Sequence, residues 1–146
     1  MEYKYSVDNC YYKKSKKLDI LIVDDDELSA ELFKEYLSMR GHNVLSLNEG
    51  VKCISYCMKN NFDIIFLDYH IGDIDGVELA DCLKDVLKTK SKIYAYTGDN
   101  NPESIKKFKD IGMNGVLIKP IDLNKINNII IDIENENVQT KNIIMF

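Results

Sequence analysis

The sequence predicts an α/β protein built on a doubly wound, five-stranded parallel sheet. Short apolar segments rich in β-branched residues alternate along the chain with segments whose apolar residues recur at helical spacing. The connections between them are short, which is typical of alternating strand and helix units in a parallel sheet. The third apolar segment, 64–67, has no polar position, as expected for a strand covered on both faces.

The first strand is expected at residues 18–23, where an apolar run meets the acids Asp24 to Glu27. A helix follows at 27–39, and Gly41 is placed to end it. We expect Asp26 and Glu27 to serve the first turn of this helix, which favours acids. One helical face is expected to carry the apolar residues Leu28, Leu32, Phe33, Tyr36 and Leu37.

The second strand is expected at 43–47, the second helix at 51–59 and the third strand at 64–67. Asp68 ends this third strand, and a third helix is expected at 77–87. The inward residues expected on that helix are Leu79, Ala80, Leu83, Val86 and Leu87.

The remaining strands are expected at 93–96, ending at Thr97, and at 115–118, ending at Lys119. The fourth helix is expected at 102–111, because Pro102 suits a first helical turn. The last helix is expected at 122–134. Its expected inward residues are Leu123, Ile126, Ile130 and Ile133, while Ile129 and Ile131 widen the apolar stripe beyond one face.

One domain is expected over residues 18–134, since a chain of 146 residues suits a single core. Residues 1–17 are expected to form a solvated N-terminal extension, and 135–146 a C-terminal tail. The sequence shows neither a membrane-length apolar stretch nor a secretory signal. The formal charge of -5 argues against nucleic acid as the main partner. The four cysteines, Cys10, Cys53, Cys57 and Cys82, form no CxxC pair, so reduced thiols in a cytoplasmic protein are expected.

The chemically active residue types all follow strands. Asp24 and Asp25 come after the first strand, Asp68 after the third, Thr97 after the fourth and Lys119 after the fifth. Carboxyl ends of parallel strands share one sheet edge, and ligands bind there at the point where the strand order reverses. With the strand order 2-1-3-4-5 of a flavodoxin-like (βα)5 fold, the three carboxylates face one another across that crevice.

These carboxylates repel, by on the order of 4 kcal/mol for a pair 4 Å apart at an effective dielectric near 20. A hard divalent cation offsets this best, and few carboxylates together with waters and a phosphate suit Mg²⁺. Lys119 and Thr97 add a cation and a hydroxyl around Asp68. The pattern therefore predicts an Asp68 nucleophile that becomes an aspartyl-phosphate, with Mg²⁺ and Lys119 neutralising the phosphoryl oxygens.

The sequence resembles the receiver domains of two-component response regulators over residues 19–134. The resemblance rests on five segments in order: 22–26 (Ile-Val-Asp-Asp-Asp), 66–68 (Phe-Leu-Asp), Asp75-Gly76, Thr97-Gly98 and 115–120 (Gly-Val-Leu-Ile-Lys-Pro). It implies a phosphorelay signalling domain rather than a turnover enzyme. Asp68 would accept a phosphoryl group from a phosphohistidine on a histidine kinase or a histidine phosphotransfer protein.

The resemblance also implies roles for single residues. Asp25 and Asp68 would bind Mg²⁺ directly, Asp24 largely through water, and the main-chain carbonyl of His70 would complete the protein ligands. Thr97 and Lys119 would contact the phosphoryl group, and the Lys119-Pro120 bond would be cis. No DNA-binding module is expected on this chain, so output would come from a downstream protein partner, at the face built by the fourth helix, the fifth strand and the fifth helix.

Four positions bear on how such a domain would switch. Val116 stands where the family has its switch aromatic, three residues before Lys119, so the usual threonine–aromatic coupling is not expected. Gly72 replaces a proline common in the loop after the acceptor, which predicts a looser loop. His70 and Asp99 flank the site where the family tunes phosphoryl lifetime, although a solvent-facing role is equally open for His70.

Three other interpretations stay open at the level of sequence. The chain could be the receiver part of a hybrid sensor kinase, or a degenerate receiver that binds partners without phosphorylation. The third is a Mg²⁺-dependent aspartyl phosphatase of the haloacid-dehalogenase type. That chemistry needs an acid two residues after the nucleophile, where His70 follows Asp68, so this interpretation is disfavoured. The oligomeric state is not predicted.

Overall fold

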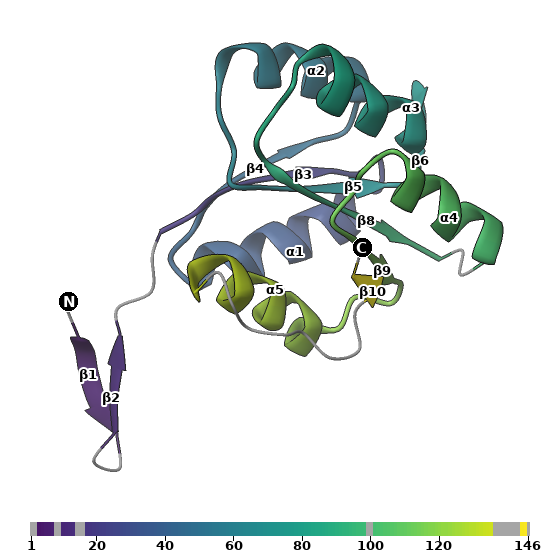
Figure 1. The fold of residues 1–146 in the computed structure, drawn as a ribbon. Coiled ribbons are helices and arrows are strands. Elements are labelled where there is room, and N and C mark those ends of the chain that lie inside the picture. The colour runs from purple at the N-terminus through teal and green to yellow at the C-terminus, as the bar shows by residue number, and fades with distance from the viewer. Residues whose placement is uncertain (1–2, 8–9, 14–16, 99–100, 136–143, 146) are drawn as a thin grey trace.

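The structure of the protein is a computed structural model, drawn in Figure 1, that describes residues 3–7, 10–13, 17–98, 101–135 and 144–145. Among these residues, the main sheet contains six strands in the order β10-β9-β8-β5-β3-β4. The bounds of these strands are β3 Asp19–Val23, β4 Asn43–Leu47, β5 Ile64–Asp68, β8 Lys92–Thr97, β9 Gly115–Ile118 and β10 Ile144–Met145.

The five strands β3, β4, β5, β8 and β9 are parallel. Their order along the sheet, β4-β3-β5-β8-β9, is the predicted 2-1-3-4-5. The register places Val23 of β3 beside Leu67 of β5, and Asp68 beside Tyr96 of β8. Thr97 is paired in turn with Ile118 of β9. The chain therefore leaves the sheet at one common edge after β3, β5, β8 and β9, as the fold-class prediction required.

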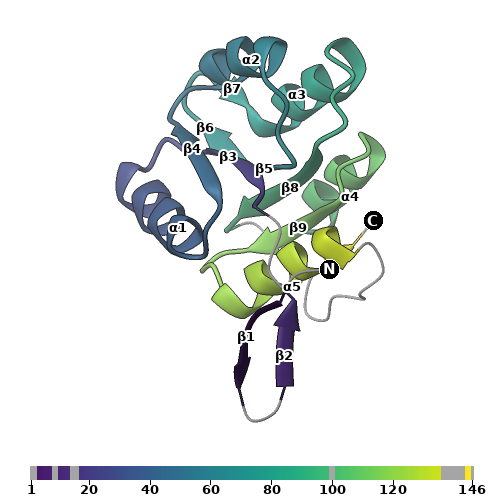
Figure 2. The same ribbon diagram turned by 90° about the vertical axis from the view of Figure 1, so that its left-hand side faces the viewer.

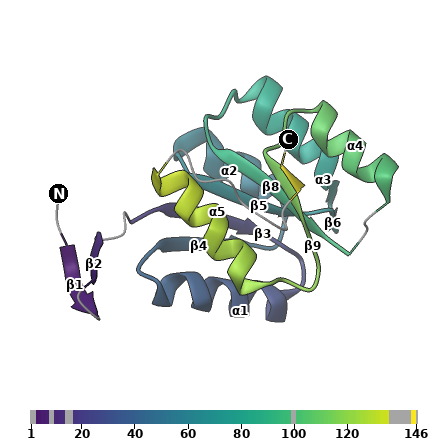
Figure 3. The same cartoon turned by 60° about the horizontal axis from the view of Figure 1, so that its bottom comes forward.

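The helices cover both faces of the sheet (Figure 2). One face carries α1 and α5, which lie side by side in Figures 1 and 3, and the other carries α2, α3 and α4. A hydrogen bond of 2.9 Å from the Tyr36 hydroxyl to Asn127 Oδ1 joins α1 to α5. The helix bounds are α1 Glu27–Met39, α2 Gly50–Lys59, α3 Gly76–Asp81, α4 Pro102–Asp110 and α5 Leu123–Asn135.

Each face has its own apolar core. The α1 and α5 side is filled largely by aromatic and isoleucine side chains, and the opposite side by smaller aliphatic ones. Phe33 of α1 packs against Phe66 of β5 with ring centroids 4.9 Å apart, and edge-on against Tyr96 at 5.9 Å. Large aromatic rings therefore reach from the middle of this core to the sheet edge at which Asp68 lies.

The expected apolar face of α1 was right at Phe33, Tyr36 and Leu37 and wrong at Leu28 and Leu32. Leu28 and Leu32 are 70% and 60% exposed, whereas Ala30, Phe33 and Leu37 are buried. The apolar residues of this helix occupy a wider arc than the sheet covers, and the part that turns inward is the one that contains Phe33.

Three further side chains differ from the expected inward sets. Val86 and Leu123 are exposed, whereas Ile129 of α5 is fully buried. Ile129 therefore belongs to the core rather than to a contact surface, while Ile131 is 40% exposed. Val86 turns outward because the third helix is not one regular α-helix: α3 ends at Asp81, and a π-helical turn continues over Cys82–Val86.

The two ends of the chain contain strands that the sequence pattern did not predict. In the N-terminal extension, β1 Tyr3–Val7 pairs antiparallel with β2 Cys10–Lys13 as a separate hairpin. In the tail, β10 pairs antiparallel with β9, with Ile144 beside Val116. The predicted five-stranded sheet thus gains an antiparallel edge strand.

Two further features of the described residues are the apolarity of the helices and the state of the cysteines. Over the described part of the chain, none of the helices has both the length and the apolarity needed to span a membrane. Cys53, Cys57 and Cys82 are free thiols, as expected, although only Cys53 is fully buried.

Candidate functional site

Three carboxylates meet at the carboxyl edge of the sheet. Asp24 directly follows β3, Asp25 is the next residue, and Asp68 is the last residue of β5. One carboxylate oxygen from each lies within 4.8 Å of those of the other two. Asp24 and Asp68 are buried, whereas Asp25 is exposed. The predicted acid cluster is therefore present, with one open side.

The chain after β3 divides its acids between two roles. Asp26 is the N-cap of α1, accepting a hydrogen bond from the Leu28 N–H at 3.2 Å and one from the Ser29 hydroxyl at 2.8 Å. The Asp26 N–H in turn donates to Asp24 Oδ1 at 2.9 Å. Among the described residues, the buried Oδ2 of Asp24 has no hydrogen-bond partner. Asp24 therefore presents a charged oxygen that lacks a donor.

Asp68 is held between opposing influences. Burial, followed by the neighbouring Asp24 carboxyl, raises the pKa of Asp68, and the Lys119 ammonium acts against that rise. Lys119 Nζ donates to Asp68 Oδ2 at 3.2 Å from the end of β9. One lysine does not balance three carboxylates, so negative charge remains at this edge.

Thr97 and Lys119 lie on neighbouring strands where both leave the sheet. Thr97 is buried at the end of β8, and its carbonyl accepts a hydrogen bond of 2.7 Å from the Lys119 N–H. The Lys119-Pro120 bond is cis, as predicted. Val116 is buried in β9 and leaves the predicted switch position without an aromatic ring. The position predicted to tune the phosphoryl lifetime at Asp99 lies outside the described residues.

The loop after Asp68 folds back on itself as a short hairpin of β6 His70–Ile71 and β7 Ile74–Asp75. Gly76 follows it, and a Cβ at this position would lie 2.7 Å from the Asp68 carbonyl oxygen. Only glycine therefore allows this close backbone approach. The exposed His70 donates its N–H to Asp68 Oδ1 at 3.4 Å, and the ligand role of its carbonyl stays a prediction.

The predicted looseness of this loop is offset by Asp73. Its carboxylate accepts the N–H groups of Gly50 at 2.8 Å and Val51 at 3.0 Å, and so caps the N-terminus of α2. These two bonds, that to Gly50 first, lower the pKa of Asp73. The acceptor loop is thereby fastened to a helix that begins more than twenty residues earlier in the chain.

Tyr96 is a residue of this site that the sequence interpretation missed. It is fully buried in β8 beside Asp68, and its ring centroid lies 4.8 Å from Lys119 Nζ. Burial, followed by the charge of Asp24, raises the pKa of its phenol. A tyrosine next to Thr97 in a predicted strand, 93–96, without a charged residue was the available signal, but such residues usually serve only the core.

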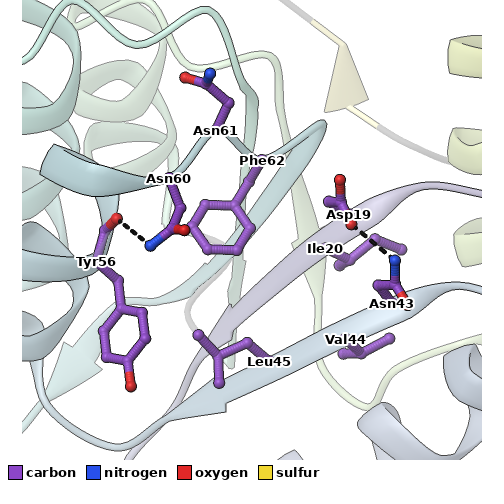
Figure 4. A pocket seen from close by; sticks show the side chains of 9 residues that line it. All are labelled: Asp19, Ile20, Asn43, Val44, Leu45, Tyr56, Asn60, Asn61 and Phe62. Atoms are coloured by element: carbon purple, nitrogen blue, oxygen red, sulfur yellow. Dashed lines mark hydrogen bonds between the residues drawn. The ribbon is translucent and has the colours of Figure 1, made fainter.

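A hollow of about 430 Å³ lies at the opposite edge of the sheet, where β3 and β4 begin (Figure 4). Amides and apolar side chains line it, and it contains none of the residues of the acid cluster. Two of its amides are already engaged, Asn60 with the Tyr56 carbonyl and Asn43 with Asp19. The chemistry that the sequence predicts therefore belongs to the carboxyl edge.

The carboxylate cluster has the donor set of a divalent cation site. Its ligand atoms are hard oxygens, which suit Mg²⁺ or Ca²⁺ rather than softer metals. The unpartnered Asp24 Oδ2 lacks the positive partner that a buried charge requires. An ion here would leave one oxygen of Asp68 beside Lys119, available as a nucleophile.

Comparison with known proteins agrees with this arrangement. The model of the response regulator receiver domain family matches residues 20–131. The sensor histidine kinase AruS of Pseudomonas aeruginosa is 30% identical over 112 residues, which are 75% of this chain and 11% of AruS. The CAI-1 autoinducer sensor kinase/phosphatase CqsS of Vibrio cholerae is 27% identical over 113 residues, 73% of this chain and 16% of CqsS. The chain thus spans less than a fifth of the length of these relatives.

Solved structures extend the likeness to the fold. A two-component response regulator from Clostridium difficile has a TM-score of 0.76 at 27% identity, covering 80% of this chain and 95% of that one. A CheY-like receiver domain from Methylobacillus flagellatus has a TM-score of 0.74 at 28% identity, covering 82% and 100%. With its acid cluster, paired lysine and matching sheet order, this chain belongs to the response regulator receiver domain family of two-component signalling.

Proposed function

We propose that this domain is a phosphoacceptor in a phosphorelay, with Asp68 as the residue that takes the phosphoryl group. The observation that carries the proposal is the contact of 3.2 Å between Asp68 Oδ2 and Lys119 Nζ beside two further carboxylates. This contact places a cation at the buried carboxylate of Asp68, the last residue of a central strand. An anion formed on Asp68 would be neutralised from that side.

In the proposed reaction, a carboxylate oxygen of Asp68 attacks the phosphorus of a phosphohistidine. The new O–P bond forms as the P–N bond breaks, and the imidazole nitrogen keeps the electron pair and takes up a proton. Lys119 and the Thr97 hydroxyl contact the transferred group. Hydrolysis of the acyl phosphate by water later restores Asp68. The domain promotes both steps on itself and is not a turnover enzyme.

The ion proposed for the cluster is Mg²⁺. Asp25 and Asp68 would bind it directly, Asp24 largely through water, and the His70 carbonyl would complete the protein ligands. Bound there, Mg²⁺ would offset the repulsion among the carboxylates and stabilise charge on the phosphoryl oxygens. The exposure of Asp25 supports this, because it leaves the cluster open to an ion and to a phosphodonor.

The proposed phosphodonor is a histidine kinase or a histidine phosphotransfer protein, and a reducing cytoplasmic setting is proposed with it. The relatives AruS and CqsS are sensor kinases, and the part that matches this chain is 11% of AruS and 16% of CqsS. A second candidate is therefore that this domain is the receiver part of a hybrid sensor kinase. Signalling would pass to a downstream protein partner. Val116 has no aromatic ring to couple phosphorylation to a switch. A binding module that acts without phosphorylation is therefore a further alternative to be tested.

The direct test uses a small phosphodonor, acetyl phosphate, with Mg²⁺ and the full chain. Intact mass spectrometry should show one added phosphoryl group, and Asp68→Asn should remove it. Asp73→Asn is the matched control, since Asp73 is an exposed carboxylate of the same loop, and it should label like the parent protein. Labelling that survives Asp68→Asn would refute the assignment, and no labelling at all would favour the binding module.

A further inference from the structure

Tyr96 occupies an unusual position for a core residue. It is fully buried in β8, and its neighbour in the register is Asp68 on β5. Its ring packs edge-on against Phe33 at 5.9 Å on the α1 side of the sheet. Tyr94, two residues earlier in the same strand, is also buried on this face, but it lies beside Phe66 instead. The two tyrosines therefore share a core and differ in their distance from the site.

The ring of Tyr96 is in contact with the lysine of the site. Lys119 Nζ lies 4.8 Å from the ring centroid and 3.2 Å from Asp68 Oδ2. An ammonium at this distance over an aromatic face is attracted by the ring quadrupole, more strongly when it is shielded from water. The Lys119 side chain is only 30% exposed, so the ring and the carboxylate together define where its charge lies.

The hydroxyl of Tyr96 is buried within reach of the charges of the acid cluster. Among the described residues it has no hydrogen-bond partner, and the same is true of the buried Asp24 Oδ2. Burial comes first among the causes that raise the pKa of this phenol, and the charges of Asp24, Asp68 and Asp25 add to it. A phenol is a hydrogen-bond donor, so the unpartnered Tyr96 hydroxyl can serve an acceptor that lacks a donor.

We propose that Tyr96 is a positioning residue of the phosphoryl-transfer site. Its ring places the Lys119 ammonium beside Asp68, and its hydroxyl, unpartnered in this structure, is the donor available to the Asp24 carboxylate when that acid orients for a divalent ion. This inference rests on the proposed function for its biological meaning. Its structural content, a tyrosine that organises the lysine and one acid, does not depend on phosphorylation.

The ring and the hydroxyl are tested separately in the full chain. Tyr96→Phe keeps the ring and removes the donor, whereas Tyr96→Leu removes both. Tyr94→Phe and Tyr94→Leu are the matched controls in the same strand and core. Three readouts are compared: the NMR shifts of the Lys119 side-chain methylenes, the Mg²⁺ dissociation constant from a titration, and the rate of labelling by acetyl phosphate.

Ring-current shifts of the Lys119 methylenes are expected in the parent protein and in Tyr96→Phe, and they should disappear in Tyr96→Leu. Tyr96→Phe should weaken Mg²⁺ binding about tenfold, as loss of a partner behind a metal ligand typically does. Tyr96→Leu should in addition slow labelling, because Lys119 is no longer held at Asp68. Both Tyr94 variants should leave the Lys119 shifts and the Mg²⁺ affinity unchanged.

Two results would overturn the inference. Lys119 methylenes at ordinary positions in the parent protein would show that the ring does not hold the ammonium, without recourse to any variant. Equal loss of Mg²⁺ affinity in Tyr94→Phe and Tyr96→Phe would reduce Tyr96 to a core residue. Because the shifts and the titration need no phosphodonor, a failure of labelling alone refutes the proposed function and leaves this inference standing.

Discussion

The acids at the two edges of the sheet differ in how their carboxylates are paired. At the amino edge, Asp63 Oδ2 accepts the Asp19 N–H at 2.8 Å, and Asp19 Oδ1 accepts an Asn43 amide at 3.0 Å. At the carboxyl edge, the three carboxylates share one lysine, and Asp24 Oδ2 lacks a donor within the described residues.

This difference separates acids that hydrogen-bond to neighbouring strands from acids that are available to bind a ligand or to react. A carboxylate that only ends a strand obtains its hydrogen bonds from nearby groups, because buried or half-buried charge is costly without them. The carboxyl edge keeps an excess of negative charge that the protein does not neutralise by itself. Such an arrangement is tolerated where a ligand supplies the missing positive charge.

The largest expected effect concerns the lysine of the carboxyl edge. Lys119→Ala should slow labelling by acetyl phosphate about a hundredfold or more, the usual scale for loss of a group that stabilises developing charge. Mg²⁺ binding should persist, because the three carboxylates remain. Lys92→Ala, at the exposed start of β8, should change neither quantity. A collapse of Mg²⁺ affinity in Lys119→Ala would make this lysine a structural residue.

Removing a charge from the cluster should affect the ion next. Asp25→Asn is expected to raise the Mg²⁺ dissociation constant on the order of a hundredfold, since a direct carboxylate ligand is lost. Asp19→Asn is the control at the amino edge, where the amide oxygen can still accept from Asn43. Calorimetric titration of both variants would measure the difference. Equal affinities would show that the two edges do not differ as proposed.

The repulsion at the carboxyl edge should be visible as a pH-dependent stability. Since the pKa of Asp68 is raised in the folded protein, its contribution to stability is present below the unfolded carboxyl pKa near 4 and is lost as pH rises above it. Asp68→Asn should therefore be more stable than the parent at pH 7 without divalent ions, by roughly 1–2 kcal/mol. The gain should fade near pH 4.

Urea unfolding of the two proteins at pH 4 and pH 7 would measure this. Mg²⁺ should reduce the difference in unfolding free energy between Asp68→Asn and the parent at pH 7, because it stabilises only the parent protein. Asp63→Asn, at the amino edge, should show no such gain. A destabilised Asp68→Asn at pH 7 would mean that the Lys119 contact outweighs the repulsion among the acids.

The smallest expected effect concerns the attachment of the acceptor loop. Asp73→Ala should cost about 1 kcal/mol of unfolding free energy, the usual value of a lost helix cap. Glu49→Ala is the matched control, because Glu49 stands at the N-cap position of α2 without a side-chain capping bond. Denaturant unfolding would compare them. If both variants lost the same unfolding free energy, the capping of α2 by Asp73 would not contribute measurably to stability.

The sheet order and the acid cluster followed from local signals in the sequence. Four of the five predicted strands end at a chemically distinctive residue, and parallel topology brings those ends together whatever the details of helix packing. The contact between Asp68 and Lys119 is predictable in this way, because it needs only the strand order. The cap of Asp26 on α1 is local too and was expected.

The features that escaped prediction depend on distant parts of the chain. Asp73 caps a helix that begins before it, and Tyr96 differs from Tyr94 only through its neighbours in space. The face of α1 was misjudged because Leu28 and Leu32 lie on a stripe wider than the sheet accommodates. The terminal strand β1 does alternate apolar and polar residues, a signal that the sequence interpretation passed over, whereas β2 and β10 are too short to show the alternation of a half-buried strand.

The most direct test of the difference between the edges is a Mg²⁺ titration of the full chain followed by backbone NMR. We predict a saturable, one-site change in the amide signals of Asp24, Asp25 and Asp68, while Asp19 and Asp63 stay in place. Shifts that never saturate, or that are equally large at both edges, would contradict an ion-binding site at the carboxyl edge and the phosphoacceptor role that depends on it.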